Sequence, residues 1–224
     1  MTKKTSFSGR LIRGALLAAA VLIFSSAAYF FTPAFFSVSY SPATITPAAV
    51  ETASVPEIVH LKTPNPLRGI YMSQCVAGTP SFRDSLVKFI DESDLNAVII
   101  DIRDYTGKIS FPTNDPILKD SVSPACGARD MKEFIKTLHE KNIYVIGRIT
   151  TFQNPYYTSV HPEQAVQKKT GGVWKDYKGL AFVDVGAKAY WDTVVALGKD
   201  AYAIGFDELN FDYLRFPSDG PMSE

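Results

Sequence analysis

Near its C-terminus the chain reads Gly205-Phe206-Asp207-Glu208-Leu209-Asn210-Phe211-Asp212-Tyr213-Leu214-Arg215-Phe216-Pro217. Three carboxylates, an amide and a guanidinium stand here among apolar and aromatic residues, a mixture that neither a simple core strand nor a simple solvated loop has. Three acids within six residues repel one another unless partners or solvent separate them, so this stretch carries an electrostatic cost. We interpret it as a strand that ends in a functional site.

The alternation of side chains along a strand sorts this stretch into two faces. One face carries Phe206, Glu208, Asn210 and Asp212, and the other carries Asp207, Leu209, Phe211 and Tyr213. Asp212 lies nearest the carboxyl end, where it is placed to act as a catalytic nucleophile or base; a structural ion pair with Arg215 or Arg148 is the alternative. Glu208 lies deeper and is a further candidate catalytic acid, although an internal Arg or Lys is its more natural partner.

Upstream of this stretch, apolar runs alternate with apolar residues at helical spacing. The expected strands are 67–73, 97–102 and 143–149, and the expected helices begin at Pro80 and Met131 and span 188–204. Asp130 and Glu133 resemble a capping box at the start of the second helix. Strands that alternate with helices imply right-handed βαβ units and a parallel sheet.

Polar side chains follow the predicted strands where they end, which is typical of the active face of a (β/α)8 barrel. No nucleotide-binding glycine fingerprint follows any strand, so a dinucleotide site is not expected. Such a barrel needs about 200–250 residues, and the stretch after the linker is shorter. We therefore expect an α/β fold like a TIM barrel of which the first four strands are present. A self-contained small α/β sheet with an exposed edge is the alternative.

The second predicted strand ends in charged residues. An acid at Asp101, after a run of Val and Ile, must be desolvated, and a plain core would carry an aliphatic residue there. Arg103 shares its face by alternation, and Asp104 follows in a polar turn, where a structural role is favoured over a catalytic one. Glycoside hydrolysis needs two carboxylates, one protonated and one ionised. Asp101 therefore joins Asp212 and Glu208 as a candidate catalytic acid.

The connection 151–186 is long and aromatic, and a loop of this length inside a compact unit is usually functional. Its aromatic rings, together with that of Tyr105, are candidates for stacking on sugars, although packing is the commoner role of each. The candidate substrate-binding residues are Arg215, Arg148, Arg103, Asp104, Asp207, Trp174 and Tyr105.

The N-terminal part of the chain predicts membrane targeting. Four basic residues precede an uncharged apolar run from Gly14 to Phe31, which approaches the length of a membrane span. The expected segments are a basic cytoplasmic N-terminus (1–13), a transmembrane anchor or signal peptide (14–36), a Pro/Ser/Thr/Ala-rich linker (37–66) and the barrel part (67–224). Cleavage after Ser26-Ala27-Ala28 would instead give a secreted domain, and a buried soluble helix is a third reading. The first two place the domain outside the cytoplasm.

The charge of the chain argues against nucleic acid as a partner. The formal net charge is zero, with the N-terminal basic residues balanced by a weakly acidic remainder that has no basic stripe. We expect a carbohydrate partner instead, with the membrane contacted through the N-terminal segment.

Four blocks carry a family resemblance: Arg68 to Tyr71, Asn96 to Asp104 with Gly107, Ile143 to Ile149, and Gly205 to Pro217. In this order, over residues 67–217, they resemble the bacterial glycoside hydrolase domain of unknown function DUF4015. The resemblance implies a TIM-barrel glycosidase-like domain that is often secreted or membrane-anchored. The family's polar positions fall on Asp101, Arg103, Asp104, Arg148, Asp207, Glu208, Asp212 and Arg215.

Cys75 and Cys126 would share an oxidising compartment, where they can pair. In a barrel, one follows the first strand and the other follows the second, so both lie in loops at the same end of neighbouring strands. The sequence is consistent with either a disulfide between them or two free thiols. Without a CxxC motif and with three scattered histidines, a Cys/His zinc site has little support, and no metal is expected.

These observations predict a glycoside hydrolase that acts on an extracytoplasmic polysaccharide or cell-envelope glycan by carboxylate acid/base catalysis, without a cofactor. A non-catalytic glycan-binding module on the same fold, with Trp174 as its binding platform, is the alternative. An inactive fragment is the third possibility.

Overall fold

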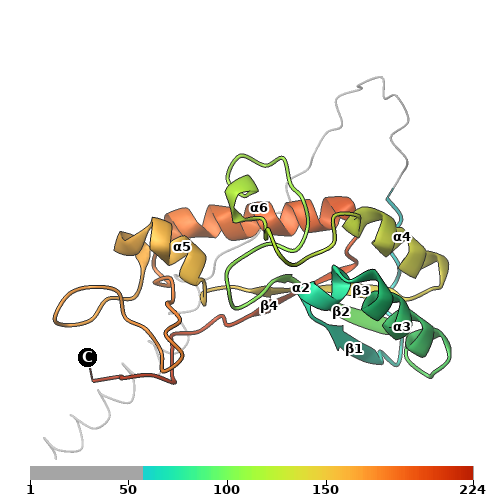
Figure 1. The fold of residues 1–224 in the computed structure, drawn as a ribbon, viewed down its shortest axis with the longest axis horizontal. Coiled ribbons are helices and arrows are strands. Elements are labelled where there is room, and N and C mark those ends of the chain that lie inside the picture. The colour runs from blue at the N-terminus through green and yellow to red at the C-terminus, as the bar shows by residue number, and fades with distance from the viewer. Residues whose placement is uncertain (1–57, 224) are drawn as a thin grey trace, which may run out of the picture. The chain divides into compact units, whose positions relative to one another are not determined.

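The computed structural model describes residues 58–223 of the chain. In this part strands alternate with helices, as Figure 1 shows. The elements in chain order are β1 (Gly69–Met72), α2 (Gln74–Ala77), α3 (Pro80–Asp91), β2 (Ala97–Arg103), η1 (Lys119–Ser121), α4 (Met131–Glu140), β3 (Tyr144–Thr150), α5 (Pro155–Val160), η2 (Pro162–Gln164), α6 (Lys188–Ile204) and β4 (Glu208–Asp212).

The strands form one parallel sheet in the order β1-β2-β3-β4. Each strand therefore lies beside the one that precedes it in sequence, with at least one helix in each crossover. Consecutive parallel strands with crossover helices on one side are the repeating unit of a (β/α)8 barrel. The predicted class, a parallel α/β sheet with four strands, is confirmed for the described residues.

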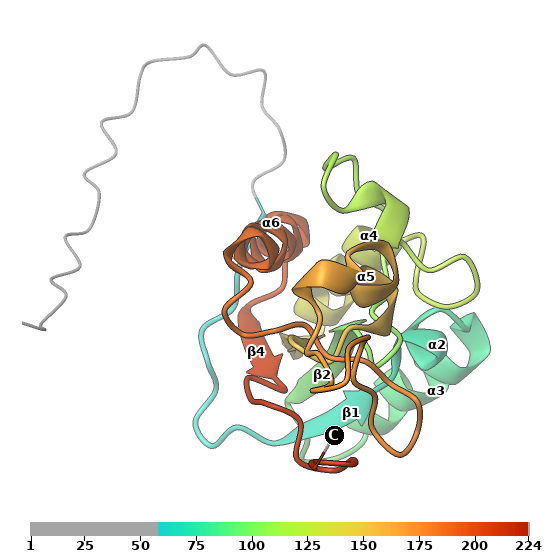
Figure 2. The ribbon, with the colours of Figure 1, turned by 90° about the vertical axis from the view of Figure 1, so that its left-hand side faces the viewer.

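Helices α3, α4 and α6 cover one face of the sheet, and Figure 2 shows them in an arc from β4 to β1. The β-branched runs of β2 and β3 supply this helix-side core, because alternate residues of a strand share a face. Its members include Val98, Ile100, Ile102, Val145, Ile149, Ile90, Ile135 and Leu197. The opposite, inner face carries Ala97, Ile99, Tyr144 and Ile146, with Leu61 packed against them.

The second helix forms as its apolar period predicts, but its predicted capping box does not. α4 buries Met131 and Phe134 among others, as its spacing requires. Asp130 makes no capping hydrogen bond, because its two carboxylate oxygens accept from Nη1 and Nη2 of Arg83 at 2.8 and 3.0 Å. A forked guanidinium is a stronger partner for a carboxylate than a single backbone N–H.

The strand predicted from residues 205–217 is shorter than that stretch. α6 ends at Ile204 and is followed by Gly205, which has a φ of +115°, and β4 begins only at Glu208. Phe206 therefore precedes the strand and is buried in the helix-side core, so its prediction on the face of Asp212 is wrong. Leu209 lies on the opposite side of β4 from Asp212 and faces α6, as predicted.

The last residues of the predicted linker contact the sheet. Leu61 N–H donates to the carboxylate of Asp207 at 2.7 Å, and the hydroxyls of Thr63 and Tyr144 are 3.0 Å apart. This segment therefore crosses the amino-terminal end of the inner face before β1 begins.

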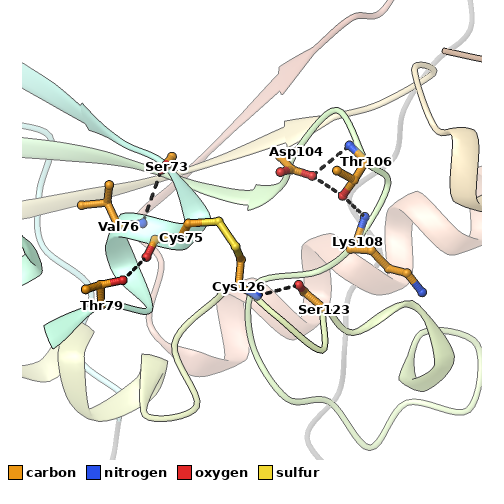
Figure 3. The surroundings of a disulfide bond; sticks show 9 residues. All are labelled: Ser73, Cys75, Val76, Thr79, Asp104, Thr106, Lys108, Ser123 and Cys126. Carbon is orange, nitrogen blue, oxygen red and sulfur yellow. Dashed lines mark hydrogen bonds between the residues drawn. A yellow bond between two sulfur atoms is a disulfide. The ribbon is translucent and has the colours of Figure 1, made fainter. Parts of the chain in front are cut away.

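A disulfide joins Cys75 in α2 to Cys126 in the connection between β2 and α4, as Figure 3 shows. The two Cα atoms are 4.4 Å apart. Both attachment points are held locally: Thr79 Oγ1 donates to the carbonyl of Cys75, and Cys126 N–H donates to Ser123 Oγ.

In residues 58–223 no helix has the length and apolar character that a membrane crossing requires. The predicted basic N-terminus, the predicted anchor at 14–36 and most of the predicted linker lie outside the described residues.

Candidate active site

The carboxyl ends of the strands bring four polar side chains together on the inner face. They are Tyr71 of β1, Asp101 of β2, Arg148 of β3 and Asp212 of β4. The parallel register places Asp101 beside Arg148 and places Thr150 beside Asp212. The inner face is apolar at its amino-terminal end and polar at its carboxyl end, so these side chains form a single cluster.

Arg148 joins the two carboxylates of this cluster. Its Nη1 donates to Asp101 Oδ1 at 2.7 Å, and its Nε and Nη2 donate to Asp212 Oδ2 at 2.9 and 2.7 Å. The hydroxyl of Tyr71 donates to Asp101 Oδ2. The side chain of Asp101 is 3% exposed, whereas that of Asp212 is 44% exposed. One acid is therefore enclosed and the other faces solvent.

The two carboxylates have pKa values that are shifted in opposite directions. Burial raises the pKa of Asp101, and the hydrogen bonds from Tyr71 and Arg148 offset only part of that rise. Burial also acts to raise the pKa of Asp212, but hydrogen bonds from Arg148 and from the Tyr213 N–H outweigh it and leave this pKa below its ordinary value. Two acids whose surroundings move their pKa values apart can divide the roles of proton donor and ionised carboxylate.

A cleft of about 500 Å³ opens beside this cluster, a volume within the usual range for small-molecule sites. The cleft and the cluster together are the candidate active site. The residues that line the cleft are Tyr71, Asp101, Asp104, Tyr105, Arg148, Thr150, Gln153, Lys178, Leu180 and Tyr213. Exposed or half-buried aromatic rings stand at its rim, and buried polar side chains form its floor.

Asp104 and Tyr105 lie where the sequence places them, in the turn after β2. Asp104 Oδ1 accepts hydrogen bonds from the N–H and the hydroxyl of Thr106, so it shapes the turn. This is the structural role that the sequence favours, although the residue also lines the cleft. The Tyr105 side chain is 58% exposed and is available for stacking.

Arg215 does not form the ion pair with Asp212 that the sequence allows. Its Nη1 donates to the carbonyl of Phe216 and to Ser218 Oγ. Its positive charge still contributes to the lowered pKa of Asp212. Arg148 is the partner of Asp212, so the second of the two predicted ion pairs is the one that forms.

Glu208 lies at the amino-terminal end of β4, about 13 Å from Asp212 along the strand at the usual rise of about 3.3 Å per residue. It accepts a hydrogen bond from the Tyr144 hydroxyl at 3.2 Å. The expected internal Arg or Lys partner is therefore wrong, and Glu208 lies outside the cluster at the carboxyl ends of the strands.

Asp207 is also remote from the cleft, which contradicts its prediction as a substrate-binding residue. Its side chain is fully buried at the amino-terminal end of the sheet. The carboxylate accepts hydrogen bonds from the N–H groups of Leu61 and Val145 and lies 3.0 Å from His139 Nε2. Asp207 thus fixes the segment before β1 and the end of α4 to the sheet.

Trp174 and Arg103 are packed inside the domain, so neither contacts a substrate directly. Trp174 is 3% exposed, donates through Nε1 to the carbonyl of Pro221, and packs edge-on against Phe182. Arg103 donates through Nε to the carbonyl of Thr150 at 3.0 Å, and burial lowers its pKa.

A change of register between Asp101 and Arg103 explains why these two side chains do not share a face. A bulge at this point breaks the alternation on which the prediction rested. Arg103 is consequently turned toward α6, with its guanidinium carbon 5.5 Å from the ring centre of Tyr190.

Several cleft residues were not predicted as site residues. Tyr71 was within reach of sequence reasoning, because it stands near the carboxyl end of the first strand in the same alternation that places Asp101 inward. Thr150 follows Arg148 by one alternation on β3. Gln153 and Lys178 enter the cleft through loop folding that has no sequence period. Tyr213 also lines the cleft, so its prediction on the face opposite Asp212 is wrong: β4 ends at Asp212, and Tyr213 has a φ of +54° that breaks the alternation. Among residues 58–223, no group of three or more His, Cys, Asp or Glu side chains is arranged to bind a metal ion.

Comparison with known proteins gives the family of the domain. Residues 69–224 match the family DUF4015, described as "Putative glycosyl hydrolase domain". The crystal structure of a hypothetical protein from Ruminiclostridium thermocellum is 31% identical, with a TM-score of 0.62 over 66% of this chain and 78% of that chain. No curated protein matches the chain.

Two distant structures share the fold at 12% identity and a TM-score of 0.51. The chitobiase of Flavobacterium johnsoniae is matched over 65% of this chain and 23% of its own, and the α-L-fucosidase isoenzyme 2 of Paenibacillus thiaminolyticus over 70% and 24%. These two likenesses show the fold alone, and the family match makes this a glycosidase-like α/β domain. The chain belongs to the DUF4015 family, as the resemblance of its sequence blocks predicts.

Proposed function

We propose that this domain is a glycoside hydrolase in which Asp101 supplies a proton to the leaving oxygen and Asp212 acts as the ionised carboxylate. The observation that carries the proposal is the opposite shift of the two pKa values in acids joined by one guanidinium. Asp212 is then the base that activates water or the nucleophile that attacks the sugar, the two roles that an ionised carboxylate has in this chemistry.

The contacts of Asp101 suggest how its proton reaches the cleft. Arg148 occupies Oδ1, and Tyr71 is bonded to Oδ2. When Asp101 is protonated on Oδ2, it donates to the Tyr71 oxygen, and the Tyr71 hydroxyl is then free to donate into the cleft. Arg148 meanwhile holds Asp212 in its ionised form and fixes its orientation.

We further propose that the substrate is an extracytoplasmic polysaccharide or cell-envelope glycan. Two observations support an exterior location: the basic and apolar N-terminal sequence, which is typical of a membrane anchor or signal peptide, and the Cys75–Cys126 disulfide. Anchoring through residues 14–36 would keep the domain at the membrane surface, and cleavage would release it.

The test is hydrolysis of a panel of cell-envelope and plant polysaccharides, measured as released reducing ends. Asp101→Asn and Asp212→Asn should each lower the rate by about 10²–10⁴-fold, the usual contribution of a positioned acid or base. Asp94→Asn, at an exposed acid outside the cleft, is the matched control and should leave the rate unchanged. Undiminished cleavage by Asp212→Asn would contradict the assignment.

A non-catalytic glycan-binding module on the same fold is the second candidate. One observation favours it: Nε, Nη1 and Nη2 of Arg148 are all occupied by the two acids, as in a structural ion-pair network. Trp174 cannot serve as the binding platform because it is buried, so exposed Tyr105 takes that place in the test. Binding without turnover that survives Asp212→Asn and is lost in Tyr105→Ala would support this candidate.

A further inference from the structure

Two buried polar atoms in the candidate active site have no hydrogen-bond partner: Thr150 Oγ1 and Gln153 Oε1. The two residues are 1% and 4% exposed, and both line the cleft. Thr150 lies on the same face of β3 as Arg148, because the residues are two apart in a strand. Buried polar groups are normally satisfied, so an unpaired pair beside one cleft points to a missing partner.

Other buried polar side chains just after β3 are satisfied. Thr151 Oγ1 donates to the carbonyl of Ile149, and Thr158 Oγ1 donates to that of Asn154. Asn154 itself uses both ends of its amide, on the N–H of Tyr157 and on the Tyr190 hydroxyl. Within this segment, the buried side-chain atoms that lack a partner are therefore those of the two residues that line the cleft.

We propose that Thr150 and Gln153 form a subsite for the hydroxyl groups of a neutral sugar ring. A hydroxyl both donates and accepts hydrogen bonds, and so do a threonine hydroxyl and a glutamine amide. Thr150 Oγ1 can therefore donate to or accept from a sugar hydroxyl, and Gln153 Oε1 can accept from one. The inference takes its ligand class from the proposed function and adds the residues that select the ligand.

The charges around the cleft argue for a neutral ring over a uronic or sulfated one. Asp101 and Asp104 line the cleft floor, and Asp212 stands beside it. The cation of the floor, Arg148, already binds two carboxylates. Lys178 is exposed at the rim. An anionic substituent at Thr150 would lose its hydration next to acids, and Lys178 at the solvent-exposed rim is the cation of the lining left to offset that cost.

The experiment uses the purified full chain with Thr150→Val and Gln153→Leu, which remove the unpaired groups at nearly constant volume. The probes are maltotriose, cellotriose and chitotriose as neutral ligands, and trigalacturonate as the anionic one. We expect binding of a neutral trisaccharide, measured by calorimetric titration, to weaken by about 2- to 10-fold in each variant, the range for one hydrogen bond between neutral groups. Trigalacturonate should bind more weakly than that trisaccharide.

Thr158→Val is the matched control, because this threonine is equally buried but already bonded. It should lower the Tm and leave the affinity unchanged. Thr150→Val should do the reverse, with a Tm that is unchanged or higher, since a buried hydroxyl without a partner costs stability. This opposite pattern separates a ligand-binding role from a structural one.

Three outcomes would overturn the inference: no neutral trisaccharide binds, trigalacturonate binds more tightly, or both cleft variants keep full affinity because water alone satisfies these groups. The same measurements test the hydrolase proposal independently.

Weakened binding in Thr150→Val, with no cleavage or with cleavage that Asp212→Asn does not change, would support the subsite and contradict the hydrolase proposal. Cleavage that depends on Asp101 and Asp212, with a KM that neither Thr150→Val nor Gln153→Leu changes, would support the hydrolase proposal and contradict the subsite.

Discussion

The disulfide between Cys75 and Cys126 should contribute about 4 kcal/mol to the stability of the domain. Its two cysteines are 51 residues apart in sequence. A cross-link over this distance removes about 14 cal/mol/K of chain entropy from the unfolded state, or about 4 kcal/mol at 25 °C. Cys75 is exposed and Cys126 is half-buried, so replacing both by alanine leaves no large cavity to add to that loss. The chain-entropy effect should therefore dominate.

The assay is urea unfolding of the purified protein, followed by tryptophan fluorescence. With a slope of about 2 kcal/mol per molar urea, the double variant Cys75→Ala/Cys126→Ala should unfold at a midpoint about 2 M lower than the parent. Adding a reductant should move the parent to the same midpoint and should not affect the variant. An unmoved midpoint, or two free thiols in non-reducing peptide mapping, would refute the reasoning.

Three further changes test the site and the sheet. Arg148→Gln should move both limbs of the pH–rate profile to higher pH, because Arg148 lowers the pKa of both carboxylates that we propose as catalytic, Asp101 and Asp212. A profile that does not shift would show that the guanidinium does not set their pKa values. Asp207→Asn should lower the free energy of unfolding by about 3 kcal/mol, because the two carboxylate oxygens accept from different backbone N–H groups and an amide keeps one acceptor for both. Glu208→Gln should cost well under 1 kcal/mol, and equal costs in urea unfolding would contradict this. Gly147→Ala should lower the free energy of unfolding by about 1–3 kcal/mol, because the added methyl group overlaps the Ile102 side chain. A Tm equal to that of the parent would contradict this.

The regular parts of the sheet could be predicted from sequence because side chains alternate between two faces along a strand and apolar residues recur at helical spacing along a helix. Apolar runs and helical spacing located the four strands, and the bounds of α6 match the prediction. The same alternation placed Asp101 and Asp212 on the inner face at the carboxyl ends. It failed at Arg103, because a bulge inserts an irregular step that leaves no mark in the order of residue types.

Side chains whose roles depend on distant partners could not be predicted in this way. Asp130 has the sequence context of a helix cap, but Arg83, which lies on α3, binds its carboxylate instead. Trp174 has the composition of a sugar platform, but the loop folds it against Phe182 and the Pro221 carbonyl. The Arg83–Asp130 and Trp174–Pro221 hydrogen bonds each join residues 47 positions apart in sequence, a separation that no local pattern contains.

The three acids within residues 205–217 are separated in space, which relieves the repulsion that their closeness in sequence implies. Between Asp207 and Asp212 the chain advances about 16 Å at the usual rise of a strand, so acids that are close in sequence are far apart in space. Each has its own kind of partner: backbone N–H groups and His139 for Asp207, the Tyr144 hydroxyl for Glu208, and Arg148 for Asp212. Asp207 is fully buried at one end, whereas Asp212 is partly exposed at the other, beside a cleft. The cluster that the sequence presents as one site is therefore two structural contacts and one carboxylate, and only that carboxylate is placed to meet a substrate.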